Sequence, residues 1–406
     1  ISSMLVPFVL LCGIRMVTDN DKPISWIQLA LVMSIVSQIH VLSIILFVIL
    51  LILFFIVGLI KANNKSRMWL DLLFAVLATL LLTANIWLSL FYSKFNENLF
   101  NPISANMAGT GISVRRFTIL TVITFLLQII YVVVNHKKSS LNVLMTSLAI
   151  IFWILSTKFF PWKIIQKMFP ILKETFQYPR RISILFIPLI LVGIAISANE
   201  IIKADNKNIT LGIVVLLSLV FLSSYNRTLR LNSFYTVNTV MLNTKENHQQ
   251  IAATKTKNLG QLFKNNIINA PDYLPKDKNI SSKKAMRLYK RVLKKSKGKF
   301  KYKVLTKGRL RIAWRSNTNK KITLPLVMYN QSQLKLNKKL KNIVHKNAIG
   351  MPRVKQKIGK NSVVLSYKNT FLFKSAITIT IISWLVVILL GIAFAIKRRS
   401  LSRVHG

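Results

Sequence analysis

Lys163, Arg180 and Arg181 are basic side chains of the segment 160–181, where apolar and basic residues are interleaved and aromatic residues stand at both ends. Segments of this composition are typical of the interface between a membrane and water. Guanidinium and ammonium groups bind phosphate through charge-assisted hydrogen bonds, so these cations are candidates for holding a phosphate that is attached to a lipid. The alternative is an amphipathic lid or anchor that binds no ligand.

His40 is an ionisable residue inside the apolar run 26–60. A titratable group in such a run is costly, and by default it marks a functional site. The run is 35 residues long, which is too much for one membrane-crossing helix and suits two short ones. We therefore expect a break at 38–40, near the outer surface, where His40 either contacts a substrate or is only solvated.

Carboxylates that could act as a base or hold a metal on the outer side are few: Glu97, Glu174 and Asp272. None is paired with another acid, so a local salt bridge to one of the many lysines explains each of them as well. The histidines are too widely spread to predict a metal cluster. They are His40, His136, His248, His345 and His405. The P-loop motif, the Gly-rich dinucleotide-binding fingerprint and the motifs of zinc proteases and serine hydrolases do not occur. We expect no bound metal and no stably bound cofactor, and leave open a divalent cation that accompanies a substrate.

The composition defines the class of protein. With 52% hydrophobic residues among 406, the chain is too apolar for a water-soluble fold. The single cysteine, Cys12, excludes an intramolecular disulfide. Fifty-eight Lys and Arg stand against 10 Asp and Glu, which is more than the loops of membrane proteins normally carry. Either the composition is generally biased, or the chain meets an anionic partner such as lipid headgroups, phosphate-rich wall polymers or nucleic acid.

Apolar segments predict an α-helical membrane bundle of about eight spans over residues 1–225, and one further span in 374–406. The predicted spans are 1–17, two within 26–60, 69–91, 117–134, 141–159, 182–198, 211–225 and 376–396. Because the sequence begins within an apolar stretch, we expect that an N-terminal part precedes it. The short loops rich in Lys and Arg fall on one side if the spans alternate, and that side is the predicted cytoplasm. The segments 92–116, 160–181 and 226–373 then face outward.

The segment 226–373 is predicted to be a basic extracytoplasmic domain, with 35 Lys and Arg against three acidic residues. A polar, helical stretch through 249–253 comes first. From about 271 onward, apolar and polar residues alternate in short runs that turn signals separate. Several short strands at such spacing predict a compact β-sandwich. The predicted strands are 300–305, 309–314, 322–329, 333–336 and 362–367.

Several short motifs, in order along the chain, resemble those of large bacterial membrane proteins allied to GT-C glycosyltransferases, namely the YfhO-like and 6-pyruvoyl-tetrahydropterin-synthase-related membrane proteins. The matching segments are SQIHVLS at 37–43, FPW at 160–162, FQYPRR at 176–181, DYLP at 272–275, LPLVMY at 324–329, LNK at 336–338 and GKNSVVLSY at 359–367. Two departures matter. Lys338 replaces a turn glycine, so we expect Asn337 alone to be left-handed in that hairpin. The family's acidic catalytic residue is expected N-terminal to this chain, so no catalytic residue is assigned.

The resemblance implies a protein of the cell membrane that transfers a sugar from a polyprenyl-phosphate donor to a cell-envelope glycopolymer or lipid, with the basic domain holding the anionic acceptor. Whether the chain is an enzyme stays open. The alternative is a non-catalytic envelope protein whose basic domain binds anionic wall polymer or scaffolds partners. A third hypothesis is nucleic-acid binding by residues 283–315, where aromatic residues are interleaved with lysines. We expect no nucleic-acid partner, because the predicted location is outside the cell.

Overall fold

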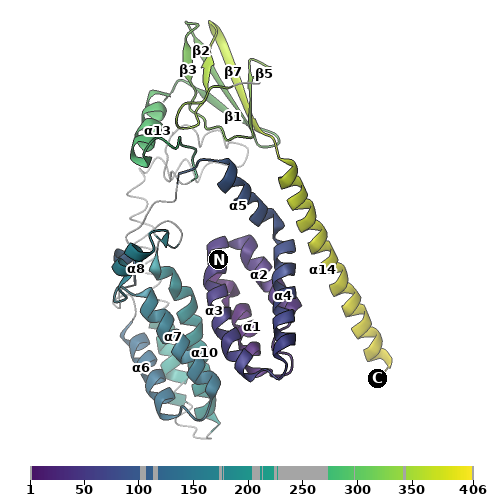
Figure 1. Cartoon of the computed structure of the whole chain (residues 1–406). Coiled ribbons are helices and arrows are strands. Elements are labelled where there is room, and N and C mark those ends of the chain that lie inside the picture. Colours follow the sequence, from purple (N-terminus) through teal and green to yellow (C-terminus); the bar gives the residue numbers. More distant parts are fainter. Residues whose placement is uncertain are drawn as a thin grey trace. The chain divides into compact units, whose positions relative to one another are not determined.

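The computed structural model describes residues 2–100, 107–112, 118–172, 176, 178–203, 211–212, 214–223, 226, 273–296, 298–341 and 344–404. The predicted helix at 249–253 and the candidate acids Glu174 and Asp272 lie outside these residues. The chain forms two compact units (Figure 1). The helical unit comprises Ile1–Trp87, Ser104–Leu231 and Ala376–Gly406, and the sheet unit comprises Leu88–Ile103 and Asn232–Ser375. The inclusion of Leu88–Ile103 in the sheet unit is not evident from the sequence.

The helical unit is built from apolar helices whose first turns are capped where the sequence offers a polar side chain. The side chains of Asn64, Thr118 and Ser139 accept hydrogen bonds from backbone N–H groups in the first turns of α4, α6 and α7. A buried core of aliphatic and aromatic residues joins the helices. The helices are α1 (Val6–Thr18), α2 (Trp26–Ile39), α3 (Val41–Lys61), α4 (Lys65–Leu82), α6 (Ile119–Val134), α7 (Ser140–Ser156), α8 (Trp162–Met168), α10 (Ser183–Ile202) and most of α14 (Phe371–Val404). The helix α5 (Ala84–Asn96) begins in this unit, and its residues from Leu88 on belong to the sheet unit.

Three helices of the described chain are long and apolar enough to cross a membrane, which marks a membrane protein. They are Val41–Lys61, Pro179–Ile202 and Phe371–Ala393. Their outward side chains are large and apolar, as Ile45, Ile52 and Ile56 of α3 illustrate with about half of each surface exposed. Shorter apolar helices, of 10–17 residues, account for most of the other predicted spans. The predicted number of spans stays a prediction.

The predicted break at 38–40 is present. α2 ends at Ile39, His40 is extended with φ −160° and ψ 100°, and α3 begins at Val41. The predicted span at 69–91 corresponds to α4 and α5, which bend by 71° against each other, a feature that the sequence does not predict. Thr83 lies at this bend and donates through Oγ1 to the carbonyl of Thr79 at 2.5 Å, a contact that commonly bends helices.

Polar side chains satisfy the backbone at the bend. The carbonyl of Leu82 accepts hydrogen bonds from Trp384 Nε1 at 3.0 Å and from Gln38 Nε2 at 3.4 Å. The backbone N–H of Asn85 donates to Thr380 Oγ1 at 3.0 Å. These groups could not remain unpaired among lipid tails, so the start of α14 and the end of α2 make the bend possible.

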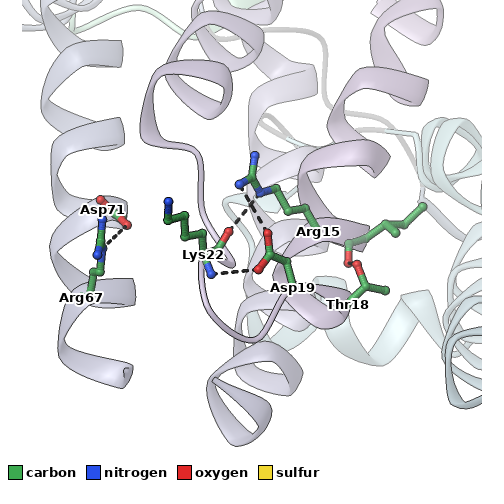
Figure 2. Close-up of polar contacts among 7 residues, drawn as sticks. Arg15, Thr18, Asp19, Lys22, Arg67 and Asp71 are labelled. Carbon is green, nitrogen blue, oxygen red and sulfur yellow. Dashed lines mark hydrogen bonds and ion pairs between the residues drawn. The ribbon is translucent and has the colours of Figure 1, made fainter. Parts of the chain in front are cut away.

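An ion pair and hydrogen bonds of charged residues stabilise the turn between α1 and α2 (Figure 2). Arg15 donates through Nε to the Lys22 carbonyl at 3.0 Å and lies 3.4 Å from Asp19 Oδ2 through Nη2. The backbone N–H of Lys22 donates to Asp19 Oδ1 at 2.9 Å. This N–H and the Arg15 guanidinium hold the pKa of Asp19 below its usual value. The turn therefore keeps an ionised carboxylate at the end of the bundle.

Loops that the sequence assigns to one side meet at one end of the helical unit. Asn63 donates through its backbone N–H to the Asn20 carbonyl at 3.0 Å. Lys61, at the end of α3, donates through Nζ to Ser140 Oγ at the start of α7, at 3.4 Å. The turns after α1, α3 and α6 thus lie together. This arrangement agrees with the predicted alternation of the spans.

The sheet unit contains two antiparallel sheets, with strand orders β1-β2-β7-β4-β5 and β3-β6. Alternate residues of each long strand enter one core, where Ile312, Leu334 and Val363 are fully buried. Residues 324–328 and β6 contribute to the same core. The strands are β1 (Lys301–Leu305), β2 (Arg309–Ser316), β3 (Lys321–Thr323), β4 (Ser332–Leu336), β5 (Lys339–Lys341), β6 (Arg353–Lys355) and β7 (Gly359–Tyr367).

Four of the five predicted strands are present, and the fifth is too long. The predicted strand 322–329 is confined to Lys321–Thr323, since Pro325 offers no N–H for a ladder. After it, Leu324, Leu326 and Met328 are buried, and the N–H groups of Leu324 and Met328 donate to the carbonyls of Pro352 and Gly350. The short strands β5 and β6 are missing from the prediction.

The helix α13 (Ser282–Ser296) packs on a second core of the sheet unit. Tyr289 is fully buried there, and its hydroxyl lies 2.7 Å from the Pro275 carbonyl and 2.6 Å from the Ile349 carbonyl. Phe100 joins this core, and its backbone N–H donates to the carbonyl of Leu274 at 2.8 Å. One phenol therefore ties α13 to two loops.

Replacing Tyr289 by Phe removes a buried hydroxyl and should lower the free energy of unfolding by about 1–3 kcal/mol. Burial raises the pKa of Tyr289, whereas the unfolded chain ionises near pH 10. The stabilisation by neutral Tyr289 is therefore present below about pH 10 and declines as the pH rises. Unfolding in urea measures the free energy of unfolding at each pH. Between about pH 8 and about pH 11, this free energy should fall less for Tyr289→Phe than for the wild type. Tyr273→Phe, at an exposed position, serves as the control.

The turn between β4 and β5 contradicts the expectation that Asn337 alone is left-handed. Asn337 has φ 48° and Lys338 has φ 71°, so both central residues adopt the conformation of a type I′ turn. Asn337 holds the turn in place, because its Oδ1 accepts a hydrogen bond from the Ser362 N–H at 2.9 Å. Lys338 makes no comparable contact among the described residues and adopts a conformation that disfavours side chains.

Lys338→Gly should raise the free energy of unfolding by about 1 kcal/mol, since glycine adopts positive φ without strain. The neighbouring change Lys339→Gly, inside β5, should lower it instead. Thermal or urea unfolding of the purified chain measures both. A loss of stability in Lys338→Gly would mean that the lysine side chain has a stabilising role.

Candidate functional site

A pocket of about 440 Å³ in the helical unit is lined by two of the predicted site residues, His40 and Arg181. They are far apart in the sequence, and the fold brings them to the same end of the bundle. The pocket's size is within the range of small-molecule sites. Its other walls are polar or apolar side chains of three elements: Ser3, Leu42, Ser43, Leu46, Ser183, Ile184, Ile187 and Pro188.

The two helices that border the pocket begin there. Leu42 and Ser43 lie in the first turn of α3, and Ser183 and Ile184 lie in the first turn of α10. The amino terminus of α3 carries partial positive charge and favours anions. At α10, the 3₁₀ helix Pro179–Ile182 runs directly into the helix, and its carbonyls accept the hydrogen bond of the Ser183 N–H. With the guanidinium of Arg181 added, the local electrostatics favour a negatively charged group.

His40 is exposed at the break between α2 and α3, where water reaches it. Its Nδ1 lies 2.9 Å from Ser43 Oγ, a contact that fixes the ring in the pocket wall. This contact does not involve Nε2, the second ring nitrogen. His40 can therefore act as a hydrogen-bonding group at the pocket.

Arg181 is held by the segment that precedes α10. Its Nη1 lies 3.5 Å from the Phe176 carbonyl, and its guanidinium carbon lies 4.9 Å from the centre of the Tyr178 ring. Arg180 lies over the same ring at 5.1 Å but does not line the pocket. Pro179 begins the short 3₁₀ helix Pro179–Ile182, where its fixed φ suits a helix start.

Lys163 is exposed on α8 and does not line the pocket. Its neighbour Trp162 is buried, donates through Nε1 to the Leu155 carbonyl at 3.1 Å and packs against Phe160 and Phe176. The FPW motif therefore anchors the loop that leads to Arg181. Of the four predicted site residues, the structure joins His40 to Arg181 and leaves Lys163 and Arg180 outside the pocket.

Of the three carboxylate candidates, Glu97 is the one within the described residues, and it does not line this pocket. Glu97 belongs to the sheet unit, where its Oε1 accepts a hydrogen bond from the backbone N–H of Asn330 at 2.7 Å. Burial and then the nearby Glu97 raise the pKa of Tyr329. The described residues hold no group of three or more His, Cys, Asp and Glu that could bind a metal. Among the described residues that line the pocket, none is a carboxylate, and the ionisable groups are His40 and Arg181.

A buried polar network within the bundle is missing from the sequence prediction. Gln128 of α6 donates through Nε2 to Asn142 Oδ1 and Thr146 Oγ1 of α7, each at 3.0 Å. Asn142 donates through Nδ2 to Ser197 Oγ of α10 at 2.8 Å. Gly193 of α10 lies against this network. The signal in the sequence that could have predicted this network is the presence of isolated amides inside apolar segments. Such groups commonly join helices in membranes.

Comparison with known protein families, curated proteins and solved structures finds no match to this chain.

Gly193 permits the close approach of α7 and α10, which gives a test of the network. A Cβ at position 193 would lie 2.8 Å from Thr146 Oγ1 and 3.0 Å from Gln128 Nε2. Gly193→Ala should therefore lower the free energy of unfolding by about 1–3 kcal/mol, against a gain in helix propensity of about 1 kcal/mol.

The matched control is Gly391→Ala in α14, because a Cβ there meets nothing within 4 Å. This control should be as stable as the wild type or slightly more so. Thermal unfolding of the detergent-solubilised chain, followed by tryptophan fluorescence, compares the two. Equal stability of the two variants would contradict the proposed close packing at Gly193.

Proposed function

We propose that this chain is a multi-pass membrane protein, similar to GT-C glycosyltransferases, that uses a polyprenyl-phosphate sugar to modify a cell-envelope glycopolymer or lipid. The observation that carries the proposal is the pocket lined by His40 and Arg181 at the first turns of α3 and α10. An amphiphile with a phosphate headgroup fits such a site, because Arg181 and the amino terminus of α3 suit the phosphate while Leu46 and Ile187 suit an apolar chain.

The order of short motifs along the chain supports the same family. Two of these motifs contribute directly to the pocket, since 37–43 supplies the helix break at His40 and 176–181 supplies Arg181. We further propose that the sheet unit is a β-sandwich outside the cell. Support comes from the single core that β3, β6 and the five-stranded sheet share, and from the meeting of the predicted cytoplasmic loops at the opposite end of α3 from His40.

The second candidate function is a non-catalytic envelope protein that binds anionic polymer or scaffolds partners. It is favoured by the exposed cations of the sheet unit, several of which lie on strands of the five-stranded sheet. Lys303, Arg311 and Lys335 are examples. Transfer of labelled sugar from a polyprenyl-phosphate donor by the full-length protein separates the two functions. Polymer binding without transfer from any donor would favour the second.

The nucleic-acid hypothesis loses its main support in the structure. Tyr289 is fully buried and Trp314 is 8% exposed, while Phe300 and Tyr302 pack against the core of the sheet unit. Aromatic rings that bind single-stranded nucleic acid must be free to stack on bases. These four rings contribute to packing instead.

The pocket is tested by replacing one of two adjacent arginines. Arg181→Gln should weaken binding of farnesyl monophosphate about 10- to 100-fold, because it removes a charge-assisted contact to the phosphate. Arg180→Gln is the matched control: it removes the same charge one residue away, from a side chain that does not line the pocket. The affinity of Arg180→Gln for farnesyl monophosphate should stay within about threefold of that of the wild type.

Affinities are measured on the full chain in detergent, with farnesol as the ligand that lacks the phosphate. Farnesol binding should be unaffected by Arg181→Gln. If both arginine variants lose affinity equally, general surface charge attracts the ligand. That outcome would exclude the pocket as the phosphate site.

A further inference from the structure

The outer face of the five-stranded sheet is covered by cations. Along β2, exposed and core-facing residues alternate, so Arg309, Arg311 and Arg315 point away from the core that contains Ile312 and Trp314. In the neighbouring strands, the residues paired with the outward-facing residues of β2 also face outward. The exposed cations on this face are Lys301, Lys303, Arg309, Arg311, Arg315, Lys335 and Lys360.

Strand register places like charges directly opposite each other. Lys303 pairs with Arg311, and Arg315 pairs with Lys360. Directly opposed residues have Cβ atoms about 4.5–5.5 Å apart, and like charges at that distance destabilise a sheet. The small sheet repeats the pattern with Lys321 opposite Lys355. A fold that needed these positions only for stability would place opposite charges or neutral polar residues there.

The described part of the sheet unit offers no carboxylate to relieve this repulsion. The ion pairs among the described residues, Arg15–Asp19 and Arg67–Asp71, both belong to the helical unit. Glu97 accepts a hydrogen bond from the Asn330 backbone, and Asp277 accepts one from the N–H of Asn279. An external anion is therefore the natural counter-charge for the sheet face.

The spacing of the cations suits a chain of repeated anionic groups. Lys303, Arg311 and Lys335 lie in one row across β1, β2, β7 and β4, interrupted by Val364. Neighbouring strands are about 4.8 Å apart, so the row extends for about 14 Å. Alternate residues along a strand are about 6.8 Å apart, so cations are also regularly spaced along the strand direction.

The remaining side chains of this face distinguish between anionic partners. Tyr302 and Trp314 occupy the core side of their strands, so the face presents no aromatic ring for base stacking among these strands. Its apolar residues, Leu305, Leu340 and Val364, are isolated and aliphatic, unlike the aromatic and leucine-rich faces that insert into membranes. A flexible polymer without bases matches the face better than nucleic acid or a bilayer.

We propose that the outer face of the five-stranded sheet binds a linear polymer with phosphate groups at regular intervals. The inference rests on the proposed function, in which the sheet unit meets an anionic envelope polymer, and it assigns that contact to one face. Each bound phosphate releases counterions, so binding should weaken steeply as the salt concentration rises.

The test compares two triple variants of the full chain that lose the same charge. One changes the sheet row, Lys303→Gln with Arg311→Gln and Lys335→Gln. The control changes α13, Lys284→Gln with Arg291→Gln and Lys295→Gln. With inorganic polyphosphate as the probe, the sheet variant should lose affinity about tenfold or more, and the slope of log K against log salt should fall by about 2. The α13 variant should change less than about threefold.

Equal losses in the two triple variants would show that net charge governs binding, and would overturn the assignment to the sheet face. The sheet variant should also unfold at a higher temperature than the wild type, because the Lys303–Arg311 repulsion is removed. If the sheet variant has normal polyphosphate affinity but lower stability, the row of cations stabilises the fold and does not bind polymer. That result would also overturn the proposal.

Two further probes decide the class of partner. Phosphatidylglycerol vesicles and single-stranded DNA should bind more weakly than polyphosphate of equal charge and should respond less to the sheet variant. A larger response of vesicles or DNA would replace the polymer by that partner. Farnesyl monophosphate should not displace polyphosphate, so a failed pocket and a failed sheet face give different results.

Discussion

Within the helical unit, buried polar groups are stabilised by partners inside the protein, since lipid tails offer none. The bend at Thr83 is stabilised in this way by side chains of α2 and α14, and the amides of Gln128 and Asn142 by each other. At the first turns of α3 and α10, by contrast, polar side chains border open space. That difference separates a polar site available to a ligand from polar groups that hold helices together.

The sheet unit follows another rule, because water solvates its outer face and charge there has no such cost. Its stability comes from two cores, one to which strands of both sheets contribute and one against which α13 packs. Cations could be placed freely on the exposed positions, yet the register sets several of them directly opposite each other. Unfavourable pairs in an otherwise regular sheet are more informative than net charge, because their arrangement depends on the fold and not on composition alone.

The sequence predicts features that depend on local pattern. The break at His40 follows from a run too long for one span, and β2 and β7 follow from strict alternation. The bend at Thr83 could not be predicted, because a lone threonine is common in straight apolar helices and the partners of the bend come from distant helices. The meeting of His40 and Arg181 is likewise tertiary: sequence places both on one side, and only packing brings them to one pocket.

The two proposed anion sites use cations in different ways. A single phosphate on a lipid is best bound by directional hydrogen bonds. The planar guanidinium of Arg181 provides them through its fixed donors and its position against Tyr178. A polymer requires many equivalent contacts and little direction, which suits a grid of lysines and arginines on a flat sheet. Lys163 and Arg180 fit neither arrangement, although they are as basic as their neighbours. Position within the fold, and not basicity, therefore decides which cations of this chain form a site.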